Sequence, residues 1–386
     1  MIYLDNAAAT PTHACVIDAM LPYFDSIFGN PSASHPMGQQ ASEDLETARG
    51  RVAELIGAES DEIIFTSGGT EADNLAILSV ATTCASHGNH IITSAIEHHA
   101  VLEVCHALES RGHRITYLPV DKYGRVSLDS LRQAADDETI LISIMAANNV
   151  MGTIQPFREI GAFARERGIL FHTDAVQMVG HLTLNVKKDN IDMLSISAHK
   201  FGGPKGIGAL YAGRNVPIAP IIYGGGQEEG LRSGTENVPG IIGIGKAAEI
   251  AMLEIEKEAA HITALRKQIE SGILETIPEV IVNGHPQERL PGNINISIRG
   301  VEGEYLAKEL GAAGLCVSTG SACSSSSLEA SHVLLALGLP HEQAHSSLRF
   351  TVGKWTTDED VDRVLEVLPH IVTRLRAMSP LLKSHK

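Results

Sequence analysis

The sequence lacks the features that mark a membrane protein or a nucleic-acid-binding protein. Its apolar runs, such as residues 140–147, are far shorter than the roughly 18 residues that span a bilayer. It holds only 30 lysines and arginines against 46 acidic residues, for a net charge of −16. This deficit of positive charge argues against a basic nucleic-acid-binding face. Asp5 stands where a signal peptide would carry basic residues, so we expect no signal peptide.

Cysteine is also scarce. The five cysteines, Cys15, Cys84, Cys105, Cys316 and Cys323, form no CxxC pair. A sparse, odd set is typical of a reducing compartment, so we predict a cytoplasmic protein without a disulfide framework. We also predict that Cys15, Cys84 and Cys105 are small buried apolar residues. The length of 386 residues suggests about two or three domains.

The hydrophobic pattern predicts an α/β fold. Apolar segments alternate with amphipathic ones through the first two-thirds of the chain, which indicates βαβ units and a mainly parallel sheet covered on both faces. A helical repeat over residues 238–277 predicts a long helix leading into a second domain. That domain begins with strands at 280–282 and 294–298. The strands predicted for the sheet are 63–66, 91–94, 115–118, 140–145, 169–173, 193–197 and 208–211.

Unusual polar residues follow five of these predicted strands. Ligands of open α/β sheets bind at the carboxyl ends of the strands, so we expect these groups to face one ligand. The five segments are Ser67-Gly68-Gly69-Thr70, Glu97-His98-His99, Asn148-Asn149, Asp174-Ala-Val-Gln177 and His199-Lys200.

Two of these segments suggest the kind of ligand. Residues 67–70 lie between a strand and a helix, where two glycines and free N–H groups suit a phosphate, although an ordinary capped turn explains them equally well. A lysine and an aspartate facing one pocket suit pyridoxal phosphate. Lys200 would form a Schiff base with the cofactor, and Asp174 would pair with its pyridinium nitrogen. A structural salt bridge is the alternative, but it leaves residues 67–70 and His98 unexplained.

Three further residues carry candidate chemistry. The His98 ring could lie over a cofactor ring and move protons; no metal site is predicted, because neither HExxH nor CxxC accompanies it. Cys323 lies in a segment rich in serine and glycine, which suits an accessible, nucleophilic thiol, although an inert cysteine explains the segment equally well. Arg349 could bind a substrate carboxylate through two N–H donors, or form a surface salt bridge.

Taken together, these segments resemble the cysteine desulfurases of the NifS/IscS type, which belong to the class V aminotransferase branch of the fold-type I pyridoxal-phosphate enzymes. The likeness extends from Tyr3 to the helix after Thr357. The segments that carry it are Tyr3-Leu-Asp-Asn-Ala-Ala, Phe28-Gly-Asn-Pro-Ser, Thr66-Ser-Gly-Gly-Thr-Glu-Ala, Glu97-His98, Asn148-Asn149, Asp174-Ala-Val-Gln177, Ser197-Ala-His-Lys200, Arg232-Ser-Gly-Thr235, Gly320-Ser-Ala-Cys323 and His345-Ser-Ser-Leu-Arg349.

The resemblance implies a fold and a set of site residues. The fold is a large pyridoxal-phosphate-binding domain, residues 15–255, with a mainly parallel seven-stranded sheet. A smaller α+β domain, residues 1–14 and 256–386, carries the catalytic cysteine. The implied catalytic residues are Cys323, Lys200 and His98. The implied cofactor-binding residues are Gly69, Thr70, His98, Asn149, Asp174, Gln177, Ser197, His199, Lys200 and Thr235, and the implied substrate-binding residues are Asn30, Asn149 and Arg349.

The resemblance also implies a reaction and partners. L-Cysteine would give L-alanine and a persulfide on Cys323, which passes its sulfur to an acceptor such as an iron–sulfur cluster scaffold protein. Thr235 would reach the phosphate of a neighbouring subunit, which implies a homodimer. A selenocysteine lyase or another class V enzyme is the alternative. A non-enzymatic scaffold would not need Lys200, and simple transamination would not need Cys323. Glu228, Glu229 and Ala330 depart from the pattern that the resemblance implies and could affect acceptor docking.

Overall fold

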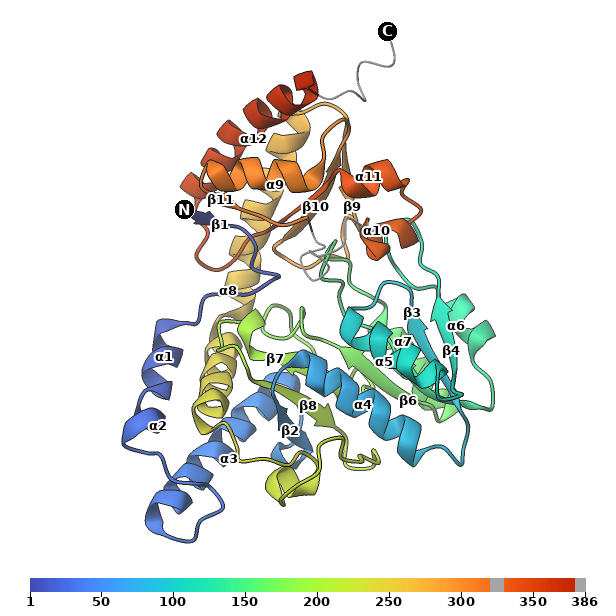
Figure 1. The fold of residues 1–386 in the computed structure, drawn as a ribbon, viewed down its shortest axis with the longest axis vertical. Coiled ribbons are helices and arrows are strands. Elements are labelled where there is room, and N and C mark those ends of the chain that lie inside the picture. Colours follow the sequence, from blue (N-terminus) through green and yellow to red (C-terminus); the bar gives the residue numbers. More distant parts are fainter. Residues whose placement is uncertain (320–329, 379–386) are drawn as a thin grey trace.

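The computed structural model describes residues 1–319 and 330–378 (Figure 1). Within these ranges the central sheet has seven strands in the order β2–β8–β7–β6–β5–β3–β4. Strand β8 is antiparallel to β2 and β7, and the other neighbours are parallel. The predicted α/β fold with a mainly parallel seven-stranded sheet is therefore confirmed. The strands are β2 (Ile63–Thr66), β3 (His90–Ser94), β4 (Arg114–Leu118), β5 (Thr139–Ser143), β6 (Leu170–Asp174), β7 (Met193–Ser197) and β8 (Gly208–Ala212).

Helices cover both faces of this sheet. The helices and short 3₁₀ turns of this part are α1 (Ala14–Met20), α2 (Pro22–Asp25), α3 (Pro36–Ile56), η1 (Ser60–Glu62), α4 (Gly69–Thr83), α5 (His99–Glu109), α6 (Leu128–Ala134), α7 (Phe157–Arg167), η2 (Ala198–Lys200), η3 (Gln227–Gly230) and α8 (Val238–Thr276). Neighbouring side chains of a strand point to opposite faces. Ile91 and Leu141 accordingly pack in the core with α4 and α5, whereas Ile92 and Ile142 pack with α3, α7 and the start of α8.

A second group of elements lies at the upper end of the molecule (Figure 1). Strands β9 (Val280–Asn283), β10 (Asn293–Ile298) and β12 (Ser347–Thr351) form an antiparallel sheet in the order β12–β10–β9, and β1 (Ile2–Tyr3) pairs with β11 (Leu315–Cys316). The accompanying helices are α9 (Gly303–Ala312), α10 (His332–Ala336), α11 (His341–His345) and α12 (Asp358–Met378). Leu4, from the start of the chain, belongs to the same apolar core as Ile296 and Val364. The domain bounds given above stay a prediction.

Helix α8 connects the two groups, as predicted from its apolar repeat. It contains 39 residues and is about 58 Å long at the usual rise of an α-helix. Ile241 and Ile244 are buried in the core under the large sheet, and Ile269 and Ile273 in the core at the other end. Near its start, a Cβ atom on Gly245 would lie only 2.6 Å from Ala48 of α3, so glycine there permits close packing of the two helices.

The cysteines only partly follow the prediction. Cys105 is buried, as expected, and Cys84 is half-buried. Cys15 is exposed, so its predicted burial was wrong. The reason is local, because α1 is short and turns Val16, not Cys15, toward the protein interior. In the part of the chain that the structure describes, no helix is long and apolar enough to cross a membrane.

A buried ion pair fixes the segment that leads to α8. Glu228 accepts two hydrogen bonds from Arg49 of α3, at 2.7 and 2.9 Å, and another from the Phe65 N–H of β2 at 2.8 Å. Only 5% of the Glu228 side chain and 11% of the Arg49 side chain are exposed. Glu229, beside it, is exposed. Glu228 therefore anchors this segment to the sheet, and of these two neighbouring acids only Glu229 is exposed.

Removing the Glu228 charge should lower stability substantially. Glu228→Gln would leave the buried Arg49 guanidinium with only Glu46, whose side chain is 57% exposed, as a counter-charge, and breaking a buried pair in this way costs about 3 kcal/mol. Urea unfolding of Glu228→Gln should show this loss. Glu229→Gln is the matched control, because it removes the neighbouring exposed charge, and its free energy of unfolding should change by less than about 0.5 kcal/mol. Equal effects of the two substitutions would contradict this role for Glu228.

Candidate active site

The carboxyl ends of the predicted strands meet at one cavity. Strands β2, β3, β5, β6 and β7 all run in the same direction, so the residues that follow them share one edge of the sheet. There, a cavity of about 380 Å³ is lined by Ala7, Ala8, Gly69, Thr70, Asp73, His98, Met145, Ala147, Asn149, Asp174, Val176, Gln177, Ser197, His199, Lys200 and Arg349. The structure thus brings together most of the site residues predicted from the sequence.

One end of the cavity is suited to an anion. Helix α4 begins at Gly69, and the first N–H groups of a helix have no carbonyl partner within it. A Cβ atom on Gly69 would lie 2.6 Å from a methyl group of Val176, so only glycine leaves this wall open. His199 lies in the same cavity, and its buried Nδ1 has no hydrogen-bond partner among the described residues. Burial, with Lys200 and Lys205 nearby, lowers the pKa of His199 to about 4, so the ring is neutral.

Buried acids lie on the α4 and β6 side of the cavity. Asp174, at the end of β6, accepts the Val176 N–H at 2.9 Å, and burial raises its pKa above the ordinary value. Asp73 of α4 is almost fully buried, and its Oδ1 has no hydrogen-bond partner among the described residues. Burial, followed by the nearby Asp174, raises the pKa of Asp73 well above its ordinary value. A ligand that presents a positive charge to this side would therefore be stabilised.

His98 is held at the start of α5. Its Nδ1 accepts the Ala100 N–H at 3.1 Å, which leaves the proton of a neutral ring on Nε2. The preceding residue, Glu97, is fully buried and accepts hydrogen bonds from Ser94 at 2.5 Å and from the Met145 N–H at 3.1 Å. Burial raises the pKa of Glu97 to about 8. Glu97 thus ties β3 to the segment after β5 and fixes the turn that presents His98.

Lys200 is held by the start of the chain. Its ammonium donates to the carbonyl oxygens of Ala7 at 2.6 Å and Ala8 at 2.9 Å. The Gln177 amide donates to the Ala7 carbonyl at 3.0 Å, and the Thr10 N–H donates to the His199 carbonyl at 2.8 Å. Residues 4–10, which we call the N-terminal segment, therefore close the cavity beside its lysine.

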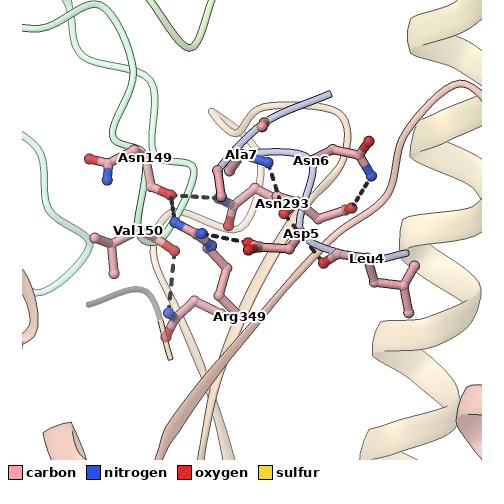
Figure 2. A network of polar contacts seen from close by, with 12 residues as sticks. Leu4, Asp5, Asn6, Ala7, Asn149, Val150, Asn293 and Arg349 are labelled. Carbon is pink, nitrogen blue, oxygen red and sulfur yellow. Dashed lines mark hydrogen bonds and ion pairs between the residues drawn. The ribbon is translucent and has the colours of Figure 1, made fainter. Parts of the chain in front are cut away.

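Arg349 enters the cavity from β12. Its guanidinium donates to Asp5 Oδ1 at 2.7 Å and to the Asn149 carbonyl at 2.9 Å (Figure 2). Only 3% of the Arg349 side chain is exposed, so it forms no surface salt bridge. The residue therefore contacts both the N-terminal segment and the loop after β5, and it presents a buried positive charge to the cavity.

Three predicted site residues are not placed in this cavity. Asn30 is exposed, and its side chain accepts the Ser32 N–H in a turn. Thr235 is exposed in the segment before α8. Cys323 lies outside the described residues. Their predicted roles in substrate binding, a neighbouring site and sulfur transfer stay predictions.

Known proteins resemble this chain over nearly its whole length. Residues 2–364 match the family described as aminotransferase class-V. This chain belongs to the class-V aminotransferase family. Two relatives named cysteine desulfurase IscS are similar to it over nearly their full lengths. The protein from Methanosarcina thermophila is 55% identical over 380 residues, covering 98% of this chain and 94% of the relative. The protein from Dictyoglomus turgidum is 54% identical over 379 residues, covering 98% and 96%.

Solved structures show the same fold. A NifS-like protein matches with a TM-score of 0.91 and 38% identity, covering 97% of this chain and 99% of that chain. A NifS-like protein from Rickettsia africae matches with a TM-score of 0.88 and 32% identity, with the same coverage. The resemblance to the NifS/IscS proteins is thereby confirmed.

Some residues of this class-V aminotransferase site were not predicted. Asp73 could have been noticed in the sequence, since it is an acid three residues after Thr70 and so lies on the same face of α4. Ala7 and Ala8 belong to the matching segment of residues 3–8, but they bind Lys200 through backbone carbonyls, for which their side chains give no signal. Asp5 lies within one of the matching segments, but its ion pair with Arg349 spans 344 positions of the sequence.

A buried histidine beneath the site makes stability sensitive to acid. His172 is fully buried between Ser143 and Ser195, and burial lowers its pKa to about 3. In the unfolded chain His172 has its ordinary pKa of about 6.5, so below that pH it binds a proton that it does not bind in the folded chain. The free energy of unfolding therefore decreases as the pH falls below about 6.5. The loss due to His172 amounts to about 3 kcal/mol by pH 4.5.

The free energy of unfolding, measured by urea at several pH values, tests this expectation. His172→Gln should lose less stability than the unmodified protein between pH 6.5 and 4.5. His341→Gln, which removes an exposed histidine, is the control and should follow the unmodified protein. Parallel losses for His172→Gln and the unmodified protein would contradict the assignment.

Proposed function

We propose that this chain is a pyridoxal-phosphate-dependent cysteine desulfurase that converts L-cysteine into L-alanine and transfers the sulfur atom to its own Cys323. The observation that carries the proposal is one cavity in which Lys200, Asp174 and the start of α4 face a common space. The relatives named cysteine desulfurase, at 55 and 54% identity, support it.

The residues present fit pyridoxal phosphate. The open wall at Gly69, the N–H groups of α4 and the unpartnered Nδ1 of His199 suit its phosphate. The buried carboxyl of Asp174 suits its ring nitrogen, and Lys200 supplies the amine that would hold it covalently. Thr70 and Ser197 would add hydroxyl donors to the phosphate, and Gln177 and Asn149 would lie near the ring hydroxyl. When bound, pyridoxal phosphate withdraws electrons from an attached amino acid and makes its α-proton acidic.

Side chains of the protein would bind the substrate and move its protons. Arg349 would bind the α-carboxylate of L-cysteine, because its guanidinium is the buried cation on the β12 side of the cavity. Asn30 and Asn149 would assist it. Lys200 Nζ would take the α-proton once the substrate has displaced it, and His98 Nε2, which carries the proton of the neutral ring, would exchange protons with the substrate.

Cys323 would accept the sulfur. Its thiolate attacks the substrate sulfur, so that an S–S bond forms as the bond between carbon and sulfur breaks. The substrate carbon keeps the electron pair of the broken bond and gains the proton that the Cys323 thiol released on ionising, which makes the methyl group of L-alanine. Lys200 would return the α-proton to the α-carbon. The products are L-alanine and a Cys323 persulfide. An acceptor, such as an iron–sulfur cluster scaffold protein, would then take the sulfur.

We further propose a cytoplasmic homodimer. Thr235 lies exposed outside its own cavity, where it could approach the phosphate site of a second subunit. The proposal follows from the NifS/IscS resemblance, in which the residue at this position serves the neighbouring site.

One experiment tests the reaction. Purified protein loaded with pyridoxal phosphate is given L-cysteine and a thiol reductant, and alanine and sulfide are measured together. Equal amounts of the two products are expected. Release of a keto acid without alanine would contradict desulfuration and would favour another class V reaction. A strong preference for L-selenocysteine in the same assay would favour a selenocysteine lyase.

A further inference from the structure

The N-terminal segment lies against β12 in a fixed register. Asp5 is paired with Thr351 in a parallel bridge, the Thr351 N–H donates to the Leu4 carbonyl at 2.7 Å, and the Asn6 side chain donates to the Thr351 carbonyl at 2.7 Å. Residues two apart on a strand point to the same face, so Arg349 and Thr351 both face this segment. The register thus places Asp5 opposite Thr351, and Arg349, two residues earlier on the same face of β12, is close enough for its side chain to reach Asp5.

The contact between the two side chains is close and shielded from water. Arg349 Nη2 lies 2.7 Å from Asp5 Oδ1, and 3 and 18% of the two side chains are exposed. Charge-assisted hydrogen bonds of this kind are strong and fix the plane of a guanidinium. The second fixed contact runs from Arg349 Nη1 to the Asn149 carbonyl at 2.9 Å (Figure 2). Together the two contacts hold both ends of the guanidinium.

Asp5 contacts Arg349 from outside the cavity. Among the described residues that line the cavity, Arg349 is included and Asp5 is not. A guanidinium has five N–H donors, and these two contacts use two of them. The Nε atom is buried and has no hydrogen-bond partner among the described residues. Asp5 therefore leaves donors for one further carboxylate and does not occupy the space that a substrate would fill.

We propose that Asp5 is a positioning residue for substrate recognition, which holds the Arg349 guanidinium in the orientation that binds the α-carboxylate of the amino-acid substrate. This inference rests on the proposed function. It assigns the N-terminal segment two tasks, because Asp5 fixes the residue that binds the substrate while Ala7 and Ala8 bind Lys200.

The test separates recognition of the carboxylate from every other effect. L-Alanine and ethylamine differ by the carboxylate alone, and the absorbance of the bound cofactor reports the binding of each to the holoenzyme. Asp5→Asn keeps the shape of the side chain and removes its charge. This substitution should weaken the binding of L-alanine about tenfold, which is the effect of one charge-assisted hydrogen bond. It should weaken the binding of ethylamine less than about twofold. It should also raise KM for L-cysteine about tenfold with kcat nearly unchanged.

Two variants control the experiment. Asp5→Glu keeps the charge and should recover part of the affinity for L-alanine. Asp18→Asn removes an exposed acid of α1 and should leave both affinities unchanged. Cofactor content and the position of the cofactor absorbance band should match the unmodified protein in all three variants, which shows that Lys200 and the fold are intact.

The outcomes are distinguishable. If Asp5→Asn weakened the binding of L-alanine and of ethylamine equally, the inference would be overturned, since the substitution would then have disturbed the whole N-terminal segment. Unchanged affinities would overturn it as well. Both results leave the proposed function standing if the unmodified protein binds L-alanine more tightly than ethylamine. If the unmodified protein shows no such preference, the carboxylate role of Arg349 fails, and the inference fails with it.

Discussion

Replacing Lys200 by alanine should abolish turnover of L-cysteine, with a loss in kcat/KM of at least about four orders of magnitude. The loss follows from position, because Lys200 brings its amine into the cavity from the end of β7 and no other lysine among the described residues lines it. Without this amine the chain can neither hold the cofactor covalently nor remove the substrate α-proton. Kinetic assays with L-cysteine measure the loss directly.

A chemical readout distinguishes this loss from misfolding. Borohydride should reduce the bond between cofactor and lysine, and the reduced adduct should be found on the peptide that contains Lys200. Lys205→Ala is the matched control, since it removes an exposed lysine from the same loop. It should retain the adduct and at least half of the activity. An adduct on another lysine, or an active Lys200→Ala protein, would contradict the assignment.

Replacing Cys323 by serine should abolish sulfide release, by more than about a hundredfold. A hydroxyl is far less nucleophilic toward sulfur than a thiolate, and the step that forms the S–S bond has no other thiol at the matching position. Cofactor content and the spectral change on adding L-cysteine should be preserved, because Lys200, Asp174 and Arg349 are intact. Sulfide assays measure the expected loss of sulfur release, and absorbance spectra measure the retained binding of cofactor and L-cysteine.

Cys15→Ser provides the matched control for this substitution. It removes an exposed thiol of α1 and should leave sulfide release unchanged. If Cys323→Ser released sulfide at the rate of the unmodified protein, a persulfide on this residue would not be an intermediate. The proposal would then need another sulfur acceptor.

The fold could be predicted from the sequence because its elements are continuous in the chain. Each strand of the large sheet except the edge strand β4 is largely buried and so appears as a short apolar run, and the predicted spans agree with β2–β8 to within about two residues. Most of the site residues could also be predicted, because they follow the predicted strands directly. Carboxyl ends of parallel strands meet at one edge, so Gly69, His98, Asp174 and Lys200 converge although they lie far apart in the sequence.

What the sequence could not reveal depends on contacts between distant backbone groups. Strand β12 is not among the strands predicted from the sequence, and its pairing with the N-terminal segment joins positions more than 340 residues apart. The carbonyls of Ala7 and Ala8 bind Lys200 without any side-chain signature. Exposure of Cys15 was missed because burial on a short helix depends on its rotation against the core.

One measurement tests the central claim most directly. A single turnover is run with an excess of protein over L-cysteine labelled at sulfur, without reductant, and both alanine and the label on each cysteine-containing peptide are measured. We expect one alanine for each labelled sulfur, with the label on Cys323 as a persulfide. Label on free sulfide from the first turnover, on another cysteine, or without matching alanine would contradict the proposal that this chain passes the sulfur of L-cysteine through Cys323.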